Sequence, residues 1–117
     1  QKALDTIKAV ANSKLSPELR SELLIVSAGA RADMGKLDAA IVTLQVPELT
    51  KLPPGTPRAR LQYAYADLLL TAGRLNEAWE WMERAAGSDI DGETDAAERC
   101  EEFAGISFTE EELGSQD

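Results

Sequence analysis

The side chains that most often carry catalysis are nearly absent from this chain. Histidine, the usual general base near neutral pH, does not occur, and the single cysteine is Cys100. Its neighbours in sequence include Glu98, Glu101 and Glu102. This negative surrounding is expected to raise the pKa of the thiol and so to lower its reactivity. We therefore expect Cys100 to be a packed helix residue, and the chain to be no enzyme and to have no catalytic residue.

Patterns that bind cofactors or metal ions are also missing. The sequence holds no glycine-rich phosphate loop, and one cysteine without histidine cannot build a zinc site. The segment 87–98 partly fits a calcium loop, with acids at the third, fifth and twelfth positions and glycine at the sixth. Its first position, however, is Gly87, and Thr94 takes the place of an aliphatic residue at the eighth. Calcium binding is the weaker alternative, and we expect no cofactor and no metal.

Charge is distributed unevenly along the chain, whose net charge is −9. Residues 1–92 carry 11 basic and 12 acidic side chains, whereas residues 93–117 carry nine acids and one base, Arg99. An acidic surface repels phosphate, so no nucleic-acid partner is expected. No apolar stretch approaches the roughly 20 residues of a membrane span, and a single cysteine fits a reducing compartment. We expect a cytoplasmic protein without a membrane partner.

Helices are the elements that must position any binding residues. Alanine and leucine are abundant and aromatic residues make up 5%, which favours helix over strand. The run Ser16-Pro17-Glu18 is typical of a helix start, and Gly35 is typical of a helix end. Between these two signals, apolar residues at helical spacing form a stripe: Leu19, Leu23, Val26, Ala30 and Met34.

The same signals recur further along the chain. Thr56-Pro57 repeats the helix start, and Gly73 repeats the helix end 38 residues after Gly35. Small alanines at Ala40 and Ala78, five residues after each glycine, allow two antiparallel helices to approach closely. The apolar stripe of this second unit is Leu61, Tyr65, Leu68, Leu69 and Ala72. A third copy of the second-helix pattern begins at Ala3.

This pattern resembles the tetratricopeptide (TPR) family, whose unit of about 34 residues carries a glycine between its two helices and an alanine five residues later. Residues 77–86 are similar to the second helix of that unit, and Tyr65, Ala66 and Leu69 fall at packing positions of its first helix. The first unit is degenerate. Pro47 replaces its late alanine and should cut its second helix short.

The resemblance implies an all-α fold of antiparallel helix-turn-helix repeats, stacked as a short right-handed solenoid. We expect the second helix of a partial repeat at residues 2–13, repeats at 17–46 and 57–87, a capping helix at 94–104, and an extended or disordered acidic tail at 105–117. A chain that starts in mid-repeat fits a C-terminal fragment of a bacterial-type TPR protein. A generic antiparallel bundle is the alternative fold.

Trp79 and Trp81 lie two positions apart, so they cannot share one face of a helix. One of them is expected to pack between helices, and the other to reach the surface or a neighbouring unit.

The resemblance also implies a function, peptide binding by the concave face that first helices line. Matched position by position, that face would carry six candidate contacts: Glu22, Ile25, Asp33, Arg60, Tyr63 and Asp67. Only Arg60 fits the carboxylate clamp of the chaperone-binding subtype, which is therefore not expected. The leading hypothesis is a scaffold for a peptide or partner protein. The alternatives are self-association through an exposed N-terminal helix, the capping end of a longer array, or a helical accessory region of a larger enzyme.

Overall fold

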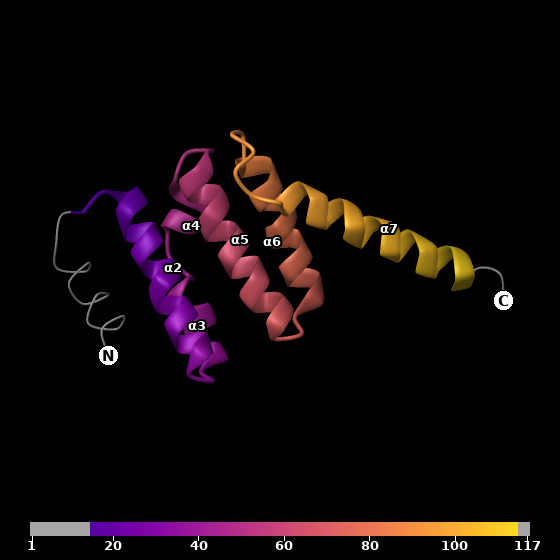
Figure 1. Ribbon diagram of the computed structural model, residues 1–117, viewed down its shortest axis with the longest axis horizontal. Helices are drawn as coiled ribbons and strands as arrows, with labels where there is room; N and C mark the ends of the chain where they lie inside the picture. Colours follow the sequence, from indigo (N-terminus) through magenta and orange to yellow (C-terminus); the bar gives the residue numbers. More distant parts are fainter. Residues whose placement is uncertain (1–14, 115–117) are drawn as a thin grey trace.

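The structure is a computed structural model that describes residues 15–114, and for residues 106–114 it describes the backbone only. Helices are the only regular elements in this part of the chain, so the expected all-α class is confirmed. They are α2 (Pro17–Asp33), α3 (Leu37–Thr43), α4 (Glu48–Lys51), α5 (Thr56–Thr71), α6 (Leu75–Ser88) and α7 (Ala96–Gly114) (Figure 1). The helix expected at residues 2–13 lies outside the described residues. No helix within residues 15–114 is long and apolar enough to cross a membrane.

Helix α2 begins and ends where its sequence signals predict. Ser16 Oγ accepts a hydrogen bond from the Leu19 amide at 3.2 Å, and Pro17 is the first helical residue. At the other end, Gly35 has a φ of +77°, a conformation that favours glycine. The chain can then reverse, and the Lys36 amide donates to the carbonyl of Arg31 at 2.9 Å.

The buried face of α2 is not the predicted stripe. Leu24 and Ala28 are 5% and 1% exposed, whereas Leu19 and Val26 are 47% and 59% exposed. Helix α2 carries apolar residues on two faces, and only one of these faces contacts α3 and α5. The spacing of apolar residues identifies both faces, but it does not say which one has a neighbour in the fold.

Helices α5 and α6 form the second hairpin. Gly73 between them has a φ of +79°, and the Arg74 amide donates to the carbonyl of Leu69 at 3.0 Å. Thr56, at the predicted helix start, is the first residue of α5, and its hydroxyl donates to Asp91 at 3.2 Å. Leu61, a member of the predicted stripe, is fully buried, as is the small Ala78 of α6.

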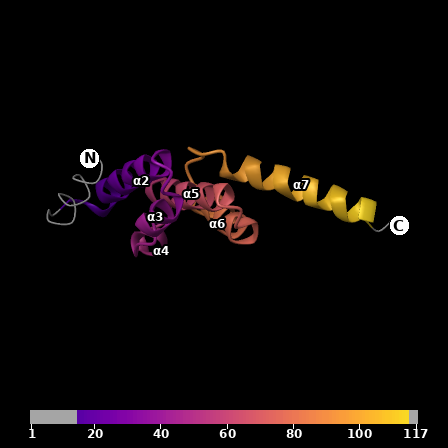
Figure 2. The same ribbon diagram turned by 90° about the horizontal axis from the view of Figure 1, so that it is seen from below.

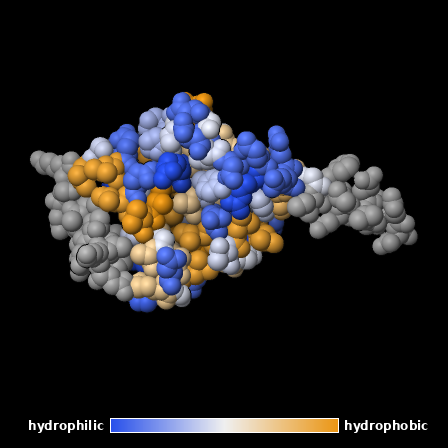
Figure 3. Space-filling view, in the orientation of Figure 1, coloured by the Kyte–Doolittle hydropathy of each residue, from blue (hydrophilic) through white to orange (hydrophobic). Residues whose placement is uncertain are grey.

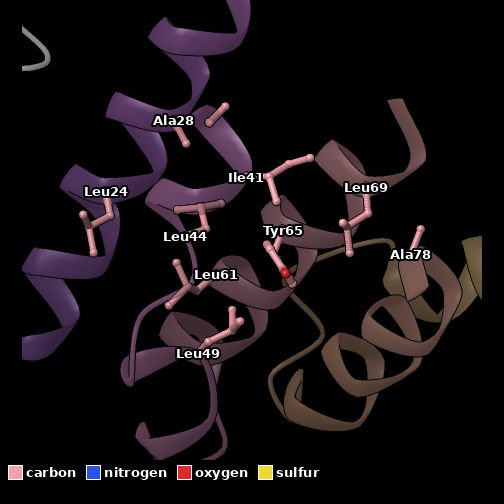
Figure 4. Packing of buried hydrophobic residues seen from close by; sticks show 10 residues of the cluster. Leu24, Ala28, Ile41, Leu44, Leu49, Leu61, Tyr65, Leu69 and Ala78 are labelled. Carbon is pink, nitrogen blue, oxygen red and sulfur yellow. The ribbon is translucent and has the colours of Figure 1, made fainter. Parts of the chain in front are cut away.

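A continuous hydrophobic core joins the two hairpins (Figure 4). Its side chains come from both hairpins and from α4, and Figure 4 shows those of α2, α3 and α5 pointing toward one another. Tyr65 of this core packs edge-on against Trp81, with ring centroids 5.3 Å apart. The core residues are Leu24, Ala28, Ala40, Ile41, Leu44, Leu49, Leu61, Tyr65, Leu69 and Ala78.

A second, smaller core lies where α7 packs on α6. Ala66, Met82, Ala85 and Ala96 are its buried members. Trp79 of α6 packs against this core and stacks on the Phe103 ring of α7. Trp81 packs against both cores, so both tryptophans pack between helices.

The connection between the two hairpins contains less irregular structure than its sequence suggests. Helix α3 ends at Thr43, which confirms that the second helix of the first unit is cut short before Pro47. The one-turn helix α4 then follows Pro47, within the stretch predicted as a connector. It is held to the body because Leu49 and Leu52 are each only 5% exposed.

A buried polar network also fastens this connection. Ser88 Oγ donates to Gln62 Oε1 at 2.7 Å, and it accepts from Arg58 Nε at 2.8 Å. The Gln62 amide donates to the carbonyl of Leu49 at 2.9 Å, and Arg58 Nη1 donates to that of Leu52 at 3.1 Å. Most buried polar groups in proteins are hydrogen-bonded, and this network pairs the buried side chains of Gln62 and Ser88.

Helix α7 continues to Gly114, ten residues past the predicted end of a capping helix at residue 104. Residues 105–114 are therefore helical, whereas an extended or disordered tail was expected; residues 115–117 lie outside the described residues. A helix can propagate without tertiary contacts through favourable residues, and this segment holds three consecutive glutamates, Glu110, Glu111 and Glu112. Figures 1 and 2 show the second half of α7 extending away from the other helices.

The helices lie in two layers. Seen from below, α2, α5 and α7 lie toward one side and α3, α4 and α6 toward the other (Figure 2). Helices α2 and α5 contact each other within their layer. This arrangement brings the side chains of α2, α5 and the start of α7 onto one face of the molecule.

Candidate functional site

Two adjoining hollows lie on the face formed by α2 and α5. The larger, of about 340 Å³, is lined by Ile25 of α2, by Arg60, Tyr63 and Ala64 of α5, and by residues 93–95 before α7. The smaller, of about 160 Å³, is lined by Ile25, Ala28, Gly29, Leu44, Ala64, Asp67 and Leu68. Because Ile25 and Ala64 line both hollows, we treat them as one depression and call it the α2–α5 groove.

Four of the six predicted contact residues line this groove. Ile25, Arg60 and Tyr63 line the larger hollow, and Asp67 lines the smaller one. Glu22 does not line either hollow, but it binds Arg60 at the edge of the larger one. The sixth, Asp33, is the last residue of α2 and lines neither of these two hollows.

Glu22 and Arg60 form a two-pronged ion pair between α2 and α5. Arg60 Nε donates to Glu22 Oε1 at 2.5 Å, and Nη2 donates to Oε2 at 3.0 Å. Planar guanidinium and carboxylate groups match in this geometry. The hydrogen bond and the charge of Glu22 raise the pKa of Arg60. The positive charge of Arg60 is therefore already compensated by the protein itself.

Tyr63 and Asp67 are bound by residues at the start of α7. The Tyr63 hydroxyl donates to Asp95 and accepts from Arg99 Nη1 at 3.0 Å. Arg99 Nη1 also donates to Asp67 Oδ1 at 3.1 Å, and its guanidinium lies 5.4 Å from the centre of the Tyr63 ring. Burial, and then the hydrogen bond to Asp95, raise the pKa of Tyr63. The first turn of α7 is thus fastened to α5 at the groove.

Asp95 and Arg99 also belong to this site, although the sequence pattern did not predict them. The pattern indicates only a capping helix that includes Asp95, and a single base, Arg99, in an acidic segment. The one signal in the sequence was the position of Arg99 as the single base among nine acids, because such an arginine is expected to pair with an acid. Its partners lie 32 and 36 positions earlier in the chain, however, so the sequence alone did not identify them.

The loop before α7 is organised by Asp89. Its carboxylate accepts from the amides of Glu93 and Thr94, both at 2.9 Å, and from the Thr94 hydroxyl at 2.6 Å. These donors, led by the Thr94 hydroxyl, lower the pKa of Asp89. Thr94 Oγ1 in turn accepts from the Ala96 amide at 3.3 Å, at the start of α7. This loop sets the position of residues 93–95 at the groove.

Two acids of the calcium-like segment, Asp89 and Asp91, are bonded to protein donors. Asp89 binds the loop amides, and Asp91 accepts from Thr56. In the part of the chain that the structure describes, no group of three acids, cysteines or histidines has the geometry to hold a metal ion.

Cys100 packs on the smaller core, and its pKa is raised as expected. The cause differs from the predicted one. Burial against α6 contributes most, the charge of Glu83 on α6 adds to it, and Arg99 opposes it. The acids beside Cys100 in sequence are not among these causes, because helical geometry turns residues one or two positions away toward other faces.

The groove has an apolar floor and an acidic rim. Ile25 and Ala64 lie between the two hollows, and hydrophobic surface (orange) crosses this face between hydrophilic areas (blue) in Figure 3. Among residues 15–105, the carboxylate of Glu93 has no hydrogen bond or ion pair of its own, whereas Arg60 and Arg99 are both paired. The uncompensated charge at the groove is therefore negative.

The chain matches no protein-family model, no curated protein and no solved structure with which it was compared. The likeness to the TPR family accordingly rests on the sequence pattern.

Proposed function

We propose that this chain is a non-catalytic interaction scaffold that binds a peptide or partner protein in the α2–α5 groove. The observation that carries the proposal is the groove itself, because Ile25, Arg60 and Tyr63 line one hollow although they come from two helices. Binding sites are concave, with an apolar lining and a few polar groups that orient the ligand. The floor of Ile25 and Ala64 and the charged edge supply these features.

We also propose that the helices form a short TPR-like solenoid. Two hairpins support this, since each turns at a glycine with positive φ, Gly35 or Gly73. Helix α2 packs beside its counterpart α5, and α7 covers α6 as a capping helix would. In such an array the α2–α5 groove corresponds to the concave face.

A selection with random displayed peptides tests the binding function. Peptides that bind the full chain are expected to lose binding to the variant Ile25→Arg, because a long charged side chain fills both hollows from the floor. The matched control is Val42→Arg, since Val42 is an apolar side chain of α3 that is 61% exposed and lines neither hollow. Selected peptides that bind Ile25→Arg as tightly as the unchanged chain would move the site away from this groove.

Self-association is the second candidate function, and the exposed stripe of α2 favours it. Leu19 and Val26, which lie about two helical turns apart on α2, are 47% and 59% exposed. Exposed apolar side chains that gather on one face are typical of surfaces that bind another protein. Light scattering is expected to show a mass that rises with concentration, and the variant Val26→Asp should abolish that rise. A monomer of unchanged mass at the highest concentration would reject this candidate.

A further inference from the structure

We propose that the α2–α5 groove takes a peptide segment in which a lysine or arginine lies beside a small apolar residue; this rests on the function proposed above and adds the chemistry of the ligand. The cationic side chain would occupy the larger hollow and the apolar one the smaller hollow.

The charges at the groove select a cation. Arg60 is held by both oxygens of Glu22, and Arg99 by Asp67 and Tyr63, so an anionic ligand meets no free positive group at either arginine. Glu93, by contrast, lines the larger hollow and is exposed, and its carboxylate has no hydrogen bond or ion pair among residues 15–105. A cation placed there gains an ion pair without breaking one that the protein already makes.

The shape and lining of the larger hollow fit a long aliphatic side chain with a charged end. Its floor is Ile25 and Ala64, and Glu93 and Asp95 stand at its edge. Lysine and arginine bury their methylene stems against apolar surface while the charged end stays near water or an acid. A purely apolar side chain would leave the carboxylate of Glu93 unpaired, and a glutamate would be repelled by it.

The smaller hollow is suited to a second, apolar contact. Ala28 and Leu68 line it, and Gly29 opens it because no side chain lies on that position. Its volume of about 160 Å³ is less than half of the 340 Å³ of its neighbour. A small aliphatic side chain next to the cationic one would therefore fill both hollows at once.

The net charge of the protein acts in the same direction. At −9 for 117 residues, the field of the molecule attracts cationic segments and repels acidic ones before any contact forms. That field alone would not give a specific site, so the experiment must separate local contacts from general attraction.

Fluorescence anisotropy with three labelled peptides makes this separation. The peptides have the same length and alternate valine with lysine, with glutamine or with glutamate. They are titrated against the full chain and against two variants with the same charge change. Glu93→Lys acts at the groove, and Glu80→Lys is the control, because Glu80 is an exposed residue of α6 that lines neither hollow. Thermal melts of both variants verify that each one folds.

The lysine peptide is expected to bind the unchanged chain most tightly and to lose about tenfold in affinity to Glu93→Lys, with a loss of less than about threefold to Glu80→Lys. Equal losses to both variants would show general charge attraction and would overturn the inference. Tighter binding of the glutamine or glutamate peptide, abolished by Ile25→Arg, would also overturn it while the groove kept its proposed function. If none of the three peptides bound, and selection from a random library also returned no peptide sensitive to Ile25→Arg, both proposals would fall.

Discussion

Glu22 of α2 and Arg60 of α5 stand 38 residues apart, at equivalent positions of the two repeat units, and their side chains meet in a two-pronged ion pair. The pair joins the two hairpins at the edge of the groove. Because the two side chains are 40% and 48% exposed, solvent screens much of their attraction.

This pair is expected to shape the groove more than it stabilises the fold. A double-mutant cycle with Glu22→Gln and Arg60→Gln should give a coupling free energy of about 0.5 kcal/mol, decreasing as salt is added. Urea unfolding of the four proteins measures it. A coupling of several kcal/mol that persists in high salt would contradict the assignment of this pair as a screened surface contact.

Two buried serines provide a matched pair of substitutions. Ser88 is 1% exposed and is hydrogen-bonded to Gln62 and Arg58, whereas Ser27 is 0% exposed and its hydroxyl has no partner among the described residues. Ser88→Ala should lower the free energy of unfolding by about 1–3 kcal/mol, because the side-chain oxygen of Gln62 is then buried without a donor. Ser27→Ala should leave the stability unchanged or raise it by about 1 kcal/mol. Urea unfolding decides, and equal losses from both changes would contradict the network.

An aromatic stack contributes to the contact between α7 and α6. The rings of Trp79 on α6 and Phe103 on α7 lie 4.2 Å apart between centroids, at 18° to each other. Phe103→Ala should destabilise the docking of α7 by about 1–2 kcal/mol. Hydrogen exchange is expected to show faster exchange of the amides at 99–105, with the amides of α5 unchanged. The control is Glu102→Ala, at the exposed residue next to Phe103, which should leave the exchange rates unchanged.

Stability at acidic pH should report on Asp89. Its folded-state pKa is lowered below the ordinary value of 3.8, chiefly by the Thr94 hydroxyl. A group of this kind stabilises the fold above its unfolded pKa, and the contribution is lost as the pH falls through the folded pKa. Asp89→Asn should therefore cost less than about 1 kcal/mol at neutral pH, since the group is near the surface, and the cost should shrink below pH 3.8. Urea unfolding against pH measures this, and Thr94→Val should reproduce part of the effect. A loss of stability from Asp89→Asn that grew as the pH fell would contradict this role of Asp89.

Cys100 should react slowly in the folded protein. Burial, and then Glu83, raise the pKa of its thiol above the ordinary value of 9.0, so less thiolate is present at neutral pH. Alkylation by iodoacetamide is expected to be slower than in the urea-unfolded chain, with a pH midpoint shifted upward. Glu83→Gln should shift the midpoint back part of the way. A folded thiol with a midpoint below that of the unfolded chain would be incompatible with this environment.

The boundaries of the helices were predictable because their causes are local. Ser16, Gly35 and Gly73 act through hydrogen bonds and backbone angles within one turn of the chain, so their sequence context suffices. The end of α3 before Pro47 has a similarly local cause. The extension of α7 to Gly114 was not predicted, since a helix without a strong stop signal ends according to a balance of small propensities.

The candidate site was predictable in part. The repeat register predicted that Glu22, Ile25 and Tyr63 share one face, and in the structure Ile25 and Tyr63 line one hollow while Glu22 binds Arg60 at its edge. Asp95 and Arg99 were missed, since their contacts with α5 span more than 30 residues and depend on how α7 is docked. Whether the groove binds a peptide, and whether the chain is cytoplasmic, stay predictions.

By itself, the sequence determined the helical class, the two glycine turns and the paired alanines, Ala40 and Ala78, since propensity, backbone angles and side-chain size are properties of short segments. Only the tertiary structure decided which apolar face of α2 is buried, that of Leu24 and not that of Val26. It also decided that both arginines of the groove are neutralised by the protein's own acids. Burial and ion pairing are properties of the space between elements, and two helices that are each amphipathic can meet in more than one way until a whole core selects among them.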